Sequence, residues 1–208
     1  MKVLLINGSP HAKGCVYTAL SEIEKTLEKN GVESTIFHIG NKAVRGCIAC
    51  GKCRELGKCV FEDDVCNELL QQMQEADGII VGSPVYYAGP NGALCALLDR
   101  VFYSASSTLA YKPAACVLSC RRGGASASFD RLNKYFTINR MPVVTSQYWN
   151  AVHGTSPDEV MQDLEGLQIM RTLGENMAWT LMSIKKAAIT TPKKEPWTPT
   201  NFIRGEQK

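Results

Sequence analysis

Short apolar runs alternate with amphipathic helical patterns along most of this chain, and this alternation is the feature that most constrains its fold. The apolar runs lie at Val3–Ile6, Ser34–His38, Gly78–Gly82, Ala114–Ser119 and Pro142–Ser146. Between them, apolar residues recur at helical spacing at about Val16–Lys29, Val65–Glu75, Gly92–Ser104 and Ala125–Phe136. Continuous apolar runs of this length suit parallel strands that are buried on both faces. We therefore expect an α/β protein with a doubly wound, five-stranded parallel sheet in the order 2-1-3-4-5, whose ligand lies at the carboxyl ends of the strands.

A last helical pattern follows the fifth apolar run. Its start signal is Pro-Asp-Glu at residues 157–159, because proline favours the first helical turn and acids favour the positive end of a helix. Apolar residues then recur every three or four positions from Val160 to Ile184. Three prolines in the last twenty residues exclude another long helix. We expect one domain over residues 1–188 and an extended C-terminal arm over residues 189–208.

The composition is that of an ordinary globular domain. Of 208 residues, 45% are hydrophobic and 21% are charged, and the formal net charge is +3 at pH 7. This small charge is spread along the chain and argues against nucleic-acid binding, and no apolar stretch is long enough for a membrane span. The N-terminal apolar run is too short for a secretory signal, so we expect a cytoplasmic protein. There, its nine cysteines are expected to be free thiols or metal ligands rather than disulfides.

The first apolar run ends in Asn7-Gly8-Ser9-Pro10, and an amphipathic pattern begins after Gly14. A strand, a polar loop of small residues and a helix together gather backbone N–H groups at a helix N-terminus, where phosphate binds. The glycine spacing fits neither a dinucleotide fingerprint nor a Walker loop, so it favours a monophosphate such as that of FMN. An ordinary strand–loop–helix connection is the alternative. The expected phosphate contacts are Ser9, Pro10, Gly14, Cys15, Val16, Tyr17 and Thr18.

Two further strand ends carry residues that suit a flavin. Tyrosine rings after the third run can stack on an isoalloxazine ring, although they could also lie at the boundary between core and surface. The expected contacts there are Pro84, Val85, Tyr86, Tyr87 and Gly89. The fourth run is followed by arginines and glycines, which predict a second anion site or, alternatively, solvated arginines above a helix N-terminus. The expected contacts there are Ser119, Arg121, Arg122, Gly123 and Gly124.

Cysteines follow one another closely at Cys47, Cys50, Cys53 and Cys59, in a Cys-x2-Cys-x2-Cys-x5-Cys pattern. Three cysteines spaced by three on a glycine-containing turn can reach one 4Fe–4S cubane, and the fourth can return after a short loop. Structural zinc sites more often use two separated Cys-x2-Cys pairs, so the spacing favours iron–sulfur over zinc. Thiols without a cluster are the other alternative. We expect these four residues to be metal ligands on a cysteine-rich insert at residues 45–64.

Several short motifs together resemble one family. Asn7-Gly8-Ser9-Pro10, Gly82-Ser83-Pro84-Val85-Tyr86-Tyr87 and Asp99-Arg100-Val101-Phe102 look like the NADPH-dependent FMN reductase superfamily of flavodoxin-like proteins. The resemblance covers roughly residues 1–185. It implies a flavodoxin-like fold and FMN held by three loops, with electrons from NAD(P)H. The cysteine segment resembles the compact motif of the iron–sulfur flavoproteins. One departure is Val16, which stands where many relatives carry a phosphate-binding threonine.

The resemblance implies an FMN-dependent oxidoreductase or electron-transfer flavoprotein. Its donor would be NAD(P)H or a ferredoxin-like protein, and its acceptor a small molecule or a protein. The flavin supplies the redox chemistry, and we name no catalytic acid or base, since the three histidines lack metal-ligand spacing or a triad arrangement. With a cluster present, single electrons could also pass between cluster and flavin. The alternative is a non-enzymatic redox- or metal-sensing module that binds a partner through its cysteine segment.

Two segments bear on substrates and assembly. Residues 147–154 follow the fifth run, and they either line the substrate face or form a structural turn anchored by Trp149. The arm carries Trp197, Phe202 and Ile203, which a disordered tail would rarely concentrate. We expect the arm to cover a neighbouring subunit of a homodimer or homotetramer, because reductases of this type usually build flavin sites near a dimer interface. Packing on its own domain is the alternative.

Overall fold

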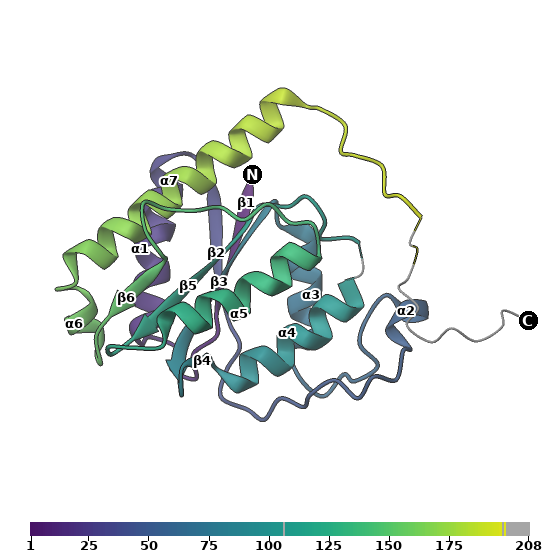
Figure 1. The fold of residues 1–208 in the computed structure, drawn as a ribbon, viewed down its shortest axis with the longest axis horizontal. Coiled ribbons are helices and arrows are strands. Elements are labelled where there is room, and N and C mark those ends of the chain that lie inside the picture. The colour runs from purple at the N-terminus through teal and green to yellow at the C-terminus, as the bar shows by residue number, and fades with distance from the viewer. Residues whose placement is uncertain (106, 197, 199–208) are drawn as a thin grey trace, which may run out of the picture.

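A parallel sheet lies between two layers of helices in the computed structural model, which describes residues 1–105, 107–196 and 198 (Figure 1). The strands are β1 (Lys2–Asn7), β2 (Glu33–His38), β3 (Gly78–Tyr86), β4 (Gly89–Pro90), β5 (Ala114–Cys120) and β6 (Ala151–His153). The helices are α1 (Cys15–Lys29), α2 (Cys53–Leu56), α3 (Cys66–Glu75), α4 (Gly92–Ala105), α5 (Ala125–Ile138), α6 (Pro157–Val160) and α7 (Leu164–Ala187).

The strand order confirms the predicted topology. The parallel strands lie in the order β2-β1-β3-β5-β6, which is 2-1-3-4-5 when only these five are numbered along the chain. The short β4 pairs with the end of β3 in an antiparallel hairpin. Because all five parallel strands run in the same direction, the segments that follow β1, β3 and β5 emerge at one edge of the sheet.

Alternating side chains of the strands build two cores. Leu4 and Ile6 of β1 belong to the core under α3, α4 and α5, whereas Val3 and Leu5 belong to the core under α1 and α7. All four side chains are 0% exposed, and burial of such a side chain contributes about 1.5–3 kcal/mol. Burial on both faces explains why β1 is an unbroken apolar run.

The fifth strand is not where the sequence pattern placed it, so the prediction of a strand at Pro142–Ser146 is wrong. Within that segment Val143 forms an isolated bridge to Ala114. The chain then leaves the sheet edge, and β6 pairs with Leu118–Cys120 of β5. Asn150 returns the chain to the sheet, because its buried side-chain amide donates to the carbonyl of Cys116 at 3.0 Å.

The last helical pattern is divided into two helices, although the sequence pattern predicted one. Ser156 caps α6 by accepting from the N–H of Glu159, and α6 ends at Val160. Asp163 then caps α7 by accepting from the N–H of Gly166 at 2.9 Å. A capping aspartate inside the apolar pattern is the local signal for this break.

The predicted arm begins after α7. Residues 189–196 form no helix or strand and are exposed. The hydroxyl of Tyr111 donates to the carbonyl of Pro192 at 3.3 Å, so this first part of the arm contacts its own chain. Trp197, Phe202 and Ile203 lie outside the described residues. No helix among residues 1–105, 107–196 and 198 is both long and apolar enough to span a membrane.

Candidate functional site

Three loops that carry the predicted flavin contacts lie side by side at the carboxyl edge of the sheet. They are the first loop (residues 8–14), the second loop (residues 84–90) and the third loop (residues 121–124). The N–H of Gly8 donates to the carbonyl of Gly82 at 2.8 Å, which joins the first loop to the end of β3. A Cβ atom at Gly124 would stand 2.7 Å from the Cα of Ala88, so the third loop packs against the second. The three loops are therefore neighbours at this edge of the sheet.

Buried polar side chains hold the first loop in shape. Asn7 is 0% exposed, and its Oδ1 accepts from the N–H of Ser9 at 3.1 Å while its Nδ2 donates to the carbonyl of Ala12 at 3.2 Å. Nε2 of His38 donates to the carbonyl of Ser9 at 2.8 Å. Sequence reasoning missed both positioning roles. Asn7 belongs to the Asn7-Gly8-Ser9-Pro10 motif, which was the available signal for its role. The partner of His38 depends on the pairing of β2 with β1, which no local pattern shows.

The N-terminus of α1 has the features of an anion site. Gly14 precedes the helix without a side-chain capping bond, and the first turn contains no acidic residue. The N–H groups of the first turn, from Cys15 to Tyr17, therefore remain available to an acceptor. The side chain of Val16 is 1% exposed and packs where a Cβ of Gly82 would lie, so Val16 can contribute only its N–H.

The hydroxyls predicted to bind phosphate differ in their partners. Oγ of Ser9 accepts from the N–H of His11 at 3.1 Å, which leaves its own hydrogen free to donate. Oγ1 of Thr18 donates to the carbonyl of Gly14 at 3.3 Å and must rotate before it could donate to a ligand. Lys13 adds a cation that sequence reasoning passed over, with its ammonium 3.7 Å from the centre of the Tyr17 ring. The nearby ammonium group lowers the pKa of the Tyr17 hydroxyl.

The second loop is a tight hairpin with a strained tip. Tyr87 and Ala88 both have left-handed backbones, with φ of 50° and 58°. Non-glycine residues in this conformation cost free energy and tend to gather at functional sites. The Tyr87 ring is fully exposed and Tyr86 is 46% exposed, so both offer a ring surface to a ligand. Pro84 and Val85 are half-buried below them, and Gly89 opens β4.

Asn91 joins the second loop to the first, a role that the sequence analysis missed. Its side-chain amide donates to the carbonyl of Gly8 at 2.8 Å, and its N–H donates to Oγ of Ser83 at 3.0 Å. Asn91 directly precedes α4 and accepts from the N–H of Ala93, which is the usual behaviour of an N-cap asparagine. The sequence Pro-Asn-Gly at 90–92 was the available signal.

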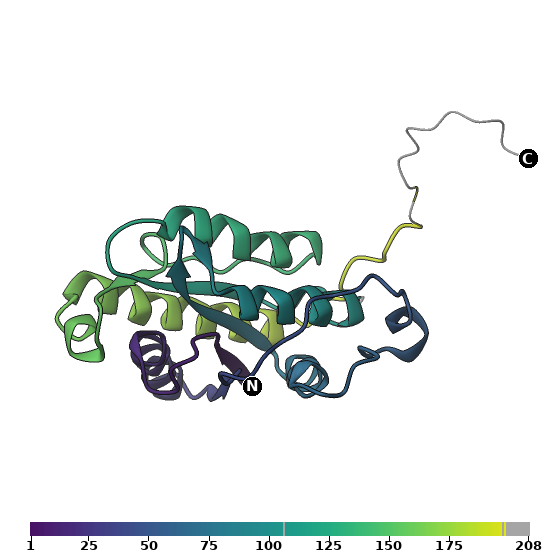
Figure 2. The ribbon, with the colours of Figure 1, turned by 90° about the horizontal axis from the view of Figure 1, so that it is seen from below.

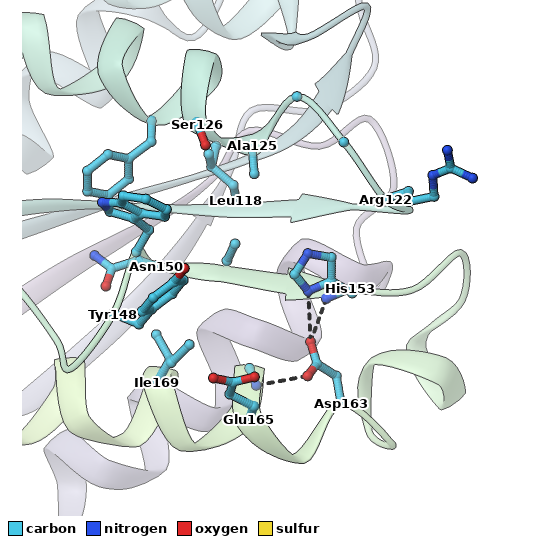
Figure 3. A pocket seen from close by; sticks show the side chains of 16 residues that line it. Leu118, Arg122, Ala125, Ser126, Tyr148, Asn150, His153, Asp163, Glu165 and Ile169 are labelled. Atoms are coloured by element: carbon cyan, nitrogen blue, oxygen red, sulfur yellow. Dashed lines mark hydrogen bonds and ion pairs between the residues drawn. The ribbon is translucent and has the colours of Figure 1, made fainter.

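The third loop combines a buried strand end with exposed arginines. Ser119 is buried, whereas Arg121, Arg122 and Gly123 are exposed. In Figure 3 the Arg122 side chain points away from Tyr148 and Asn150. Gly124 has φ of +89°, a left-handed conformation that glycine adopts without strain. The backbone of this loop therefore faces the second loop, and the guanidinium groups reach into solvent.

A cavity of about 240 Å³ lies beside the third loop, between the starts of α5 and α7 (Figure 3). Its walls include the rings of Phe129, Tyr148 and Trp149. At its rim, Oδ2 of Asp163 accepts from the N–H of His153 at 2.7 Å and lies 3.3 Å from Nδ1 of the same histidine. Within the segment 147–154, residues 148–151 and His153 thus line a cavity adjacent to the predicted flavin loops.

The cysteine insert projects at one end of the molecule with α2, as Figures 1 and 2 both show. Cys47, Cys50, Cys53 and Cys59 all line one cavity of about 190 Å³, together with Phe61 and part of α4. The first two are exposed, Cys53 is half-buried and Cys59 is buried. Within the described part of the chain, no group of three or more His, Cys, Asp or Glu side chains is placed closely enough to hold one metal ion. The four cysteines therefore share one cavity, and the predicted ligand set stays a prediction.

Family membership is settled by comparison with known proteins. Residues 1–156 match the family model of the NADPH-dependent FMN reductases. The chain belongs to this family. It is also similar to an iron–sulfur flavoprotein of Methanocaldococcus jannaschii, with 34% identity over 197 residues that cover 89% of this chain and 100% of that protein. The predicted family and the class of FMN-dependent oxidoreductase are thereby confirmed.

Solved structures agree with the family on the fold. The crystal structure of RosB superposes with a TM-score of 0.73 at 14% identity, covering 99% of this chain and 96% of that chain. A flavodoxin from the domain Archaea superposes with a TM-score of 0.60 at 15% identity, covering 88% of this chain and 99% of that chain. These likenesses confirm the predicted flavodoxin-like fold of this FMN reductase family member.

Proposed function

We propose that this chain binds FMN at the three loops and a 4Fe–4S cluster at the cysteine insert, and that it passes electrons from NAD(P)H or a ferredoxin-like donor to an acceptor. The observation that carries the flavin site is the series of contacts that joins the first loop, before the uncapped N-terminus of α1, to the second loop and the second loop to the third. The observation that supports the cluster is the single cavity shared by the four cysteines.

The first loop would hold the FMN phosphate. Ser9 has a hydroxyl hydrogen free to donate, and the N–H groups of Cys15, Val16 and Tyr17 point out of the first turn of α1. An anion at this place is stabilised by the helix dipole and by the N–H groups together. The ammonium of Lys13 lies close by, over the Tyr17 ring, and adds positive charge.

The second and third loops would hold the flavin ring. Exposed rings at Tyr86 and Tyr87 offer stacking surfaces, and such contacts contribute about 0.5–1.5 kcal/mol beyond area burial. The close packing of Gly124 against Ala88 fixes the distance between the two loops. FMN, when bound, supplies the electron-accepting group, so the task of these residues is to hold the ring and to shield it from water.

The cysteine insert suits an iron–sulfur cluster chemically. Thiolates are the ligands that these clusters prefer, and four thiols reach the same cavity. Three of these sulfur atoms have hydrogen-bond partners: Cys47 accepts from the N–H of Ala49, Cys53 donates to the carbonyl of Tyr103, and Cys59 accepts from Nε of Arg100.

Anaerobic mixing experiments test the proposed donor. Reconstituted protein is mixed with NADPH, NADH or a reduced ferredoxin, and bleaching of the flavin band is followed. We expect at least one of these donors to bleach the flavin within seconds. If none does so while FMN stays bound, the enzyme proposal fails and the sensing module is favoured.

A further inference from the structure

Arg100 is a buried cation in the wall of the cysteine cavity. It lies on α4, where it is 1% exposed, and it lines the same cavity as the four cysteines of the insert. A buried charge is expensive unless it is paired and hydrogen-bonded. The buried guanidinium of Arg100 therefore needs an acceptor for each of its donor groups.

Three of the contacts of Arg100 go to the cysteine insert. Nε donates to Sγ of Cys59 at 3.3 Å, and Nη1 donates to the carbonyl of Arg45 at 3.3 Å. Nη1 also forms an ion pair with the carboxylate of Asp64, whose side chain is 7% exposed. Asp64 in turn accepts from the N–H of Cys66 at 3.0 Å, which fixes the carboxylate.

The remaining donor group of Arg100 has no acceptor in the part of the chain that the structure describes. Nη2 is buried without a hydrogen-bond partner among the described residues. A buried donor left unpaired costs about 1–3 kcal/mol, so proteins rarely leave one. An anionic group in the cavity would supply the missing acceptor, and sulfur atoms of a thiolate-bound cluster are of that kind.

We propose that Arg100 and Asp64 form a charge pair that sets the reduction potential of the cluster held by Cys47, Cys50, Cys53 and Cys59. Arg100 donates from Nε to Sγ of Cys59 at 3.3 Å, and its unpartnered Nη2 would supply a further donor to a cluster held in this cavity. This inference rests on the proposed function. Hydrogen bonds and positive charge near the sulfurs favour the reduced cluster, which carries one more negative charge, and therefore raise its potential. The negative charge of Asp64 disfavours the reduced cluster and therefore lowers its potential.

A purely structural role is the competing explanation. Arg45, Cys59 and Asp64 all belong to the insert, so Arg100 could do no more than fasten the insert to α4. The two explanations predict different patterns of shifts in the reduction potential of the cluster. Removing either member of the pair would loosen the insert in the same way, whereas the two removals change the charge beside the cluster in opposite directions.

The test is a redox titration of the full-length, anaerobically reconstituted protein, with the cluster followed by electron paramagnetic resonance. Arg100→Gln removes the cation, and we expect the equilibrium constant for one-electron reduction to fall at least tenfold, a shift of about 59 mV. Asp64→Asn keeps the shape of the carboxylate and removes its charge, and we expect the potential to rise. The matched control is Arg131→Gln, which removes an exposed cation paired with Asp99 and should leave the potential unchanged.

Shifts of the same sign in the two variants, or no shift in loaded protein, overturn the charge-pair proposal. If the Arg100→Gln chain does not load iron, the Asp64→Asn variant decides alone, and a potential that fails to rise overturns the proposal. Wild-type protein that holds no iron would instead defeat the proposed function, so the two failures are distinguishable.

Discussion

Gly124 lies so close to Ala88 that a methyl group on Gly124 would stand 2.7 Å from the Ala88 Cα. Gly124 also has φ of +89°, and Ala88 itself has φ of 58°. The backbone of Gly124 therefore packs directly against the Cα of Ala88 and against the side chains of Val85 and Ala88. Contacts of this kind leave little room for adjustment, and they place the two ring-binding loops at a fixed separation.

Replacing Gly124 with alanine should weaken FMN binding and lower stability. The left-handed backbone alone costs about 1 kcal/mol for alanine, and the clash with Ala88 adds to it. The matched control is Gly46→Ala, because Gly46 lies in the cysteine insert outside the flavin loops, a Cβ there meets nothing within 4 Å and its φ is not left-handed. FMN affinity, measured by quenching of flavin fluorescence, should fall for Gly124→Ala alone. Equal affinities for the two variants would contradict a rigid contact between the loops.

Replacing Ser9 with glutamate should abolish FMN retention. A carboxylate in the first loop would compete with the phosphate for the N–H groups of α1 and repel it. The milder Ser9→Ala removes only the hydroxyl donor, and since a hydrogen bond to a charged group is worth about 1.5–3 kcal/mol, it should weaken binding roughly tenfold or more. Titration of flavin-free protein with FMN measures both. Undiminished binding by the glutamate variant would place the phosphate outside the first loop.

Changing Cys50 to alanine should eliminate bound iron while FMN stays bound. Arg100 in the wall of the cysteine cavity lies eight residues along α4 from Gly92, a rise of about 12 Å, so the cavity and the flavin loops are separate. Cys95→Ala, at a cysteine of α4 outside the insert, is the control that should keep its iron. Iron and flavin are quantified per chain in both. Retained iron in the Cys50 variant would remove that residue from the ligand set.

The free energy of unfolding should fall at alkaline pH, because the buried thiol of Cys116 stays protonated in the folded chain. Burial raises the pKa of Cys116, whose thiol donates weakly to Oδ1 of Asn133 at 3.6 Å. The unfolded chain releases this proton near pH 8.5 and the folded chain retains it, so the contribution to stability is complete below that pH and is lost above it. Between pH 8 and 10, the unfolding free energy of the wild type should fall about 2 kcal/mol more than that of Cys116→Ser. Urea unfolding under reducing conditions measures the difference, and equal losses would argue against a neutral buried thiol.

Truncation after Ile189 should lower the oligomeric state and loosen FMN. We infer that the apolar residues of the arm cover a neighbouring subunit, and each apolar side chain buried there contributes about 1.5–3 kcal/mol. Sedimentation measures the assembly. Tyr111→Phe is the control, because it removes only the bond to the carbonyl of Pro192 within one chain and should leave the assembly intact. An unchanged oligomer after truncation would mean that the arm serves its own domain alone.

Local patterns predicted the elements that depend on local sequence. The apolar run of β1 and the small residues after it were recognisable because strand, loop and helix follow one another directly. Asn91 was missed because its partner, the carbonyl of Gly8, is 83 positions away, and no local pattern reports such a bond. Arg100 was recognised only as part of a motif, since its burial depends on how the insert folds onto α4.

The misplaced fifth strand has a similar physical explanation. Residues 142–146 have strand-like composition, but β6 at the sheet edge consists of three residues only, Ala151–His153. What determines its place is the buried amide of Asn150, which binds the carbonyl of Cys116 on the neighbouring strand. An asparagine is an ordinary loop signal, so sequence alone favoured the more apolar segment.

The most direct test of the account is the content of flavin, iron and acid-labile sulfide in the full-length protein, purified and reconstituted without oxygen. The account predicts FMN at about one per chain and iron and sulfide at about four each per chain. The visible spectrum should then show the two flavin bands above a broad cluster absorption. FMN without iron, or thiols that all react freely with a thiol reagent in the reconstituted protein, would contradict the cluster; protein that binds no FMN at all would contradict the three-loop site.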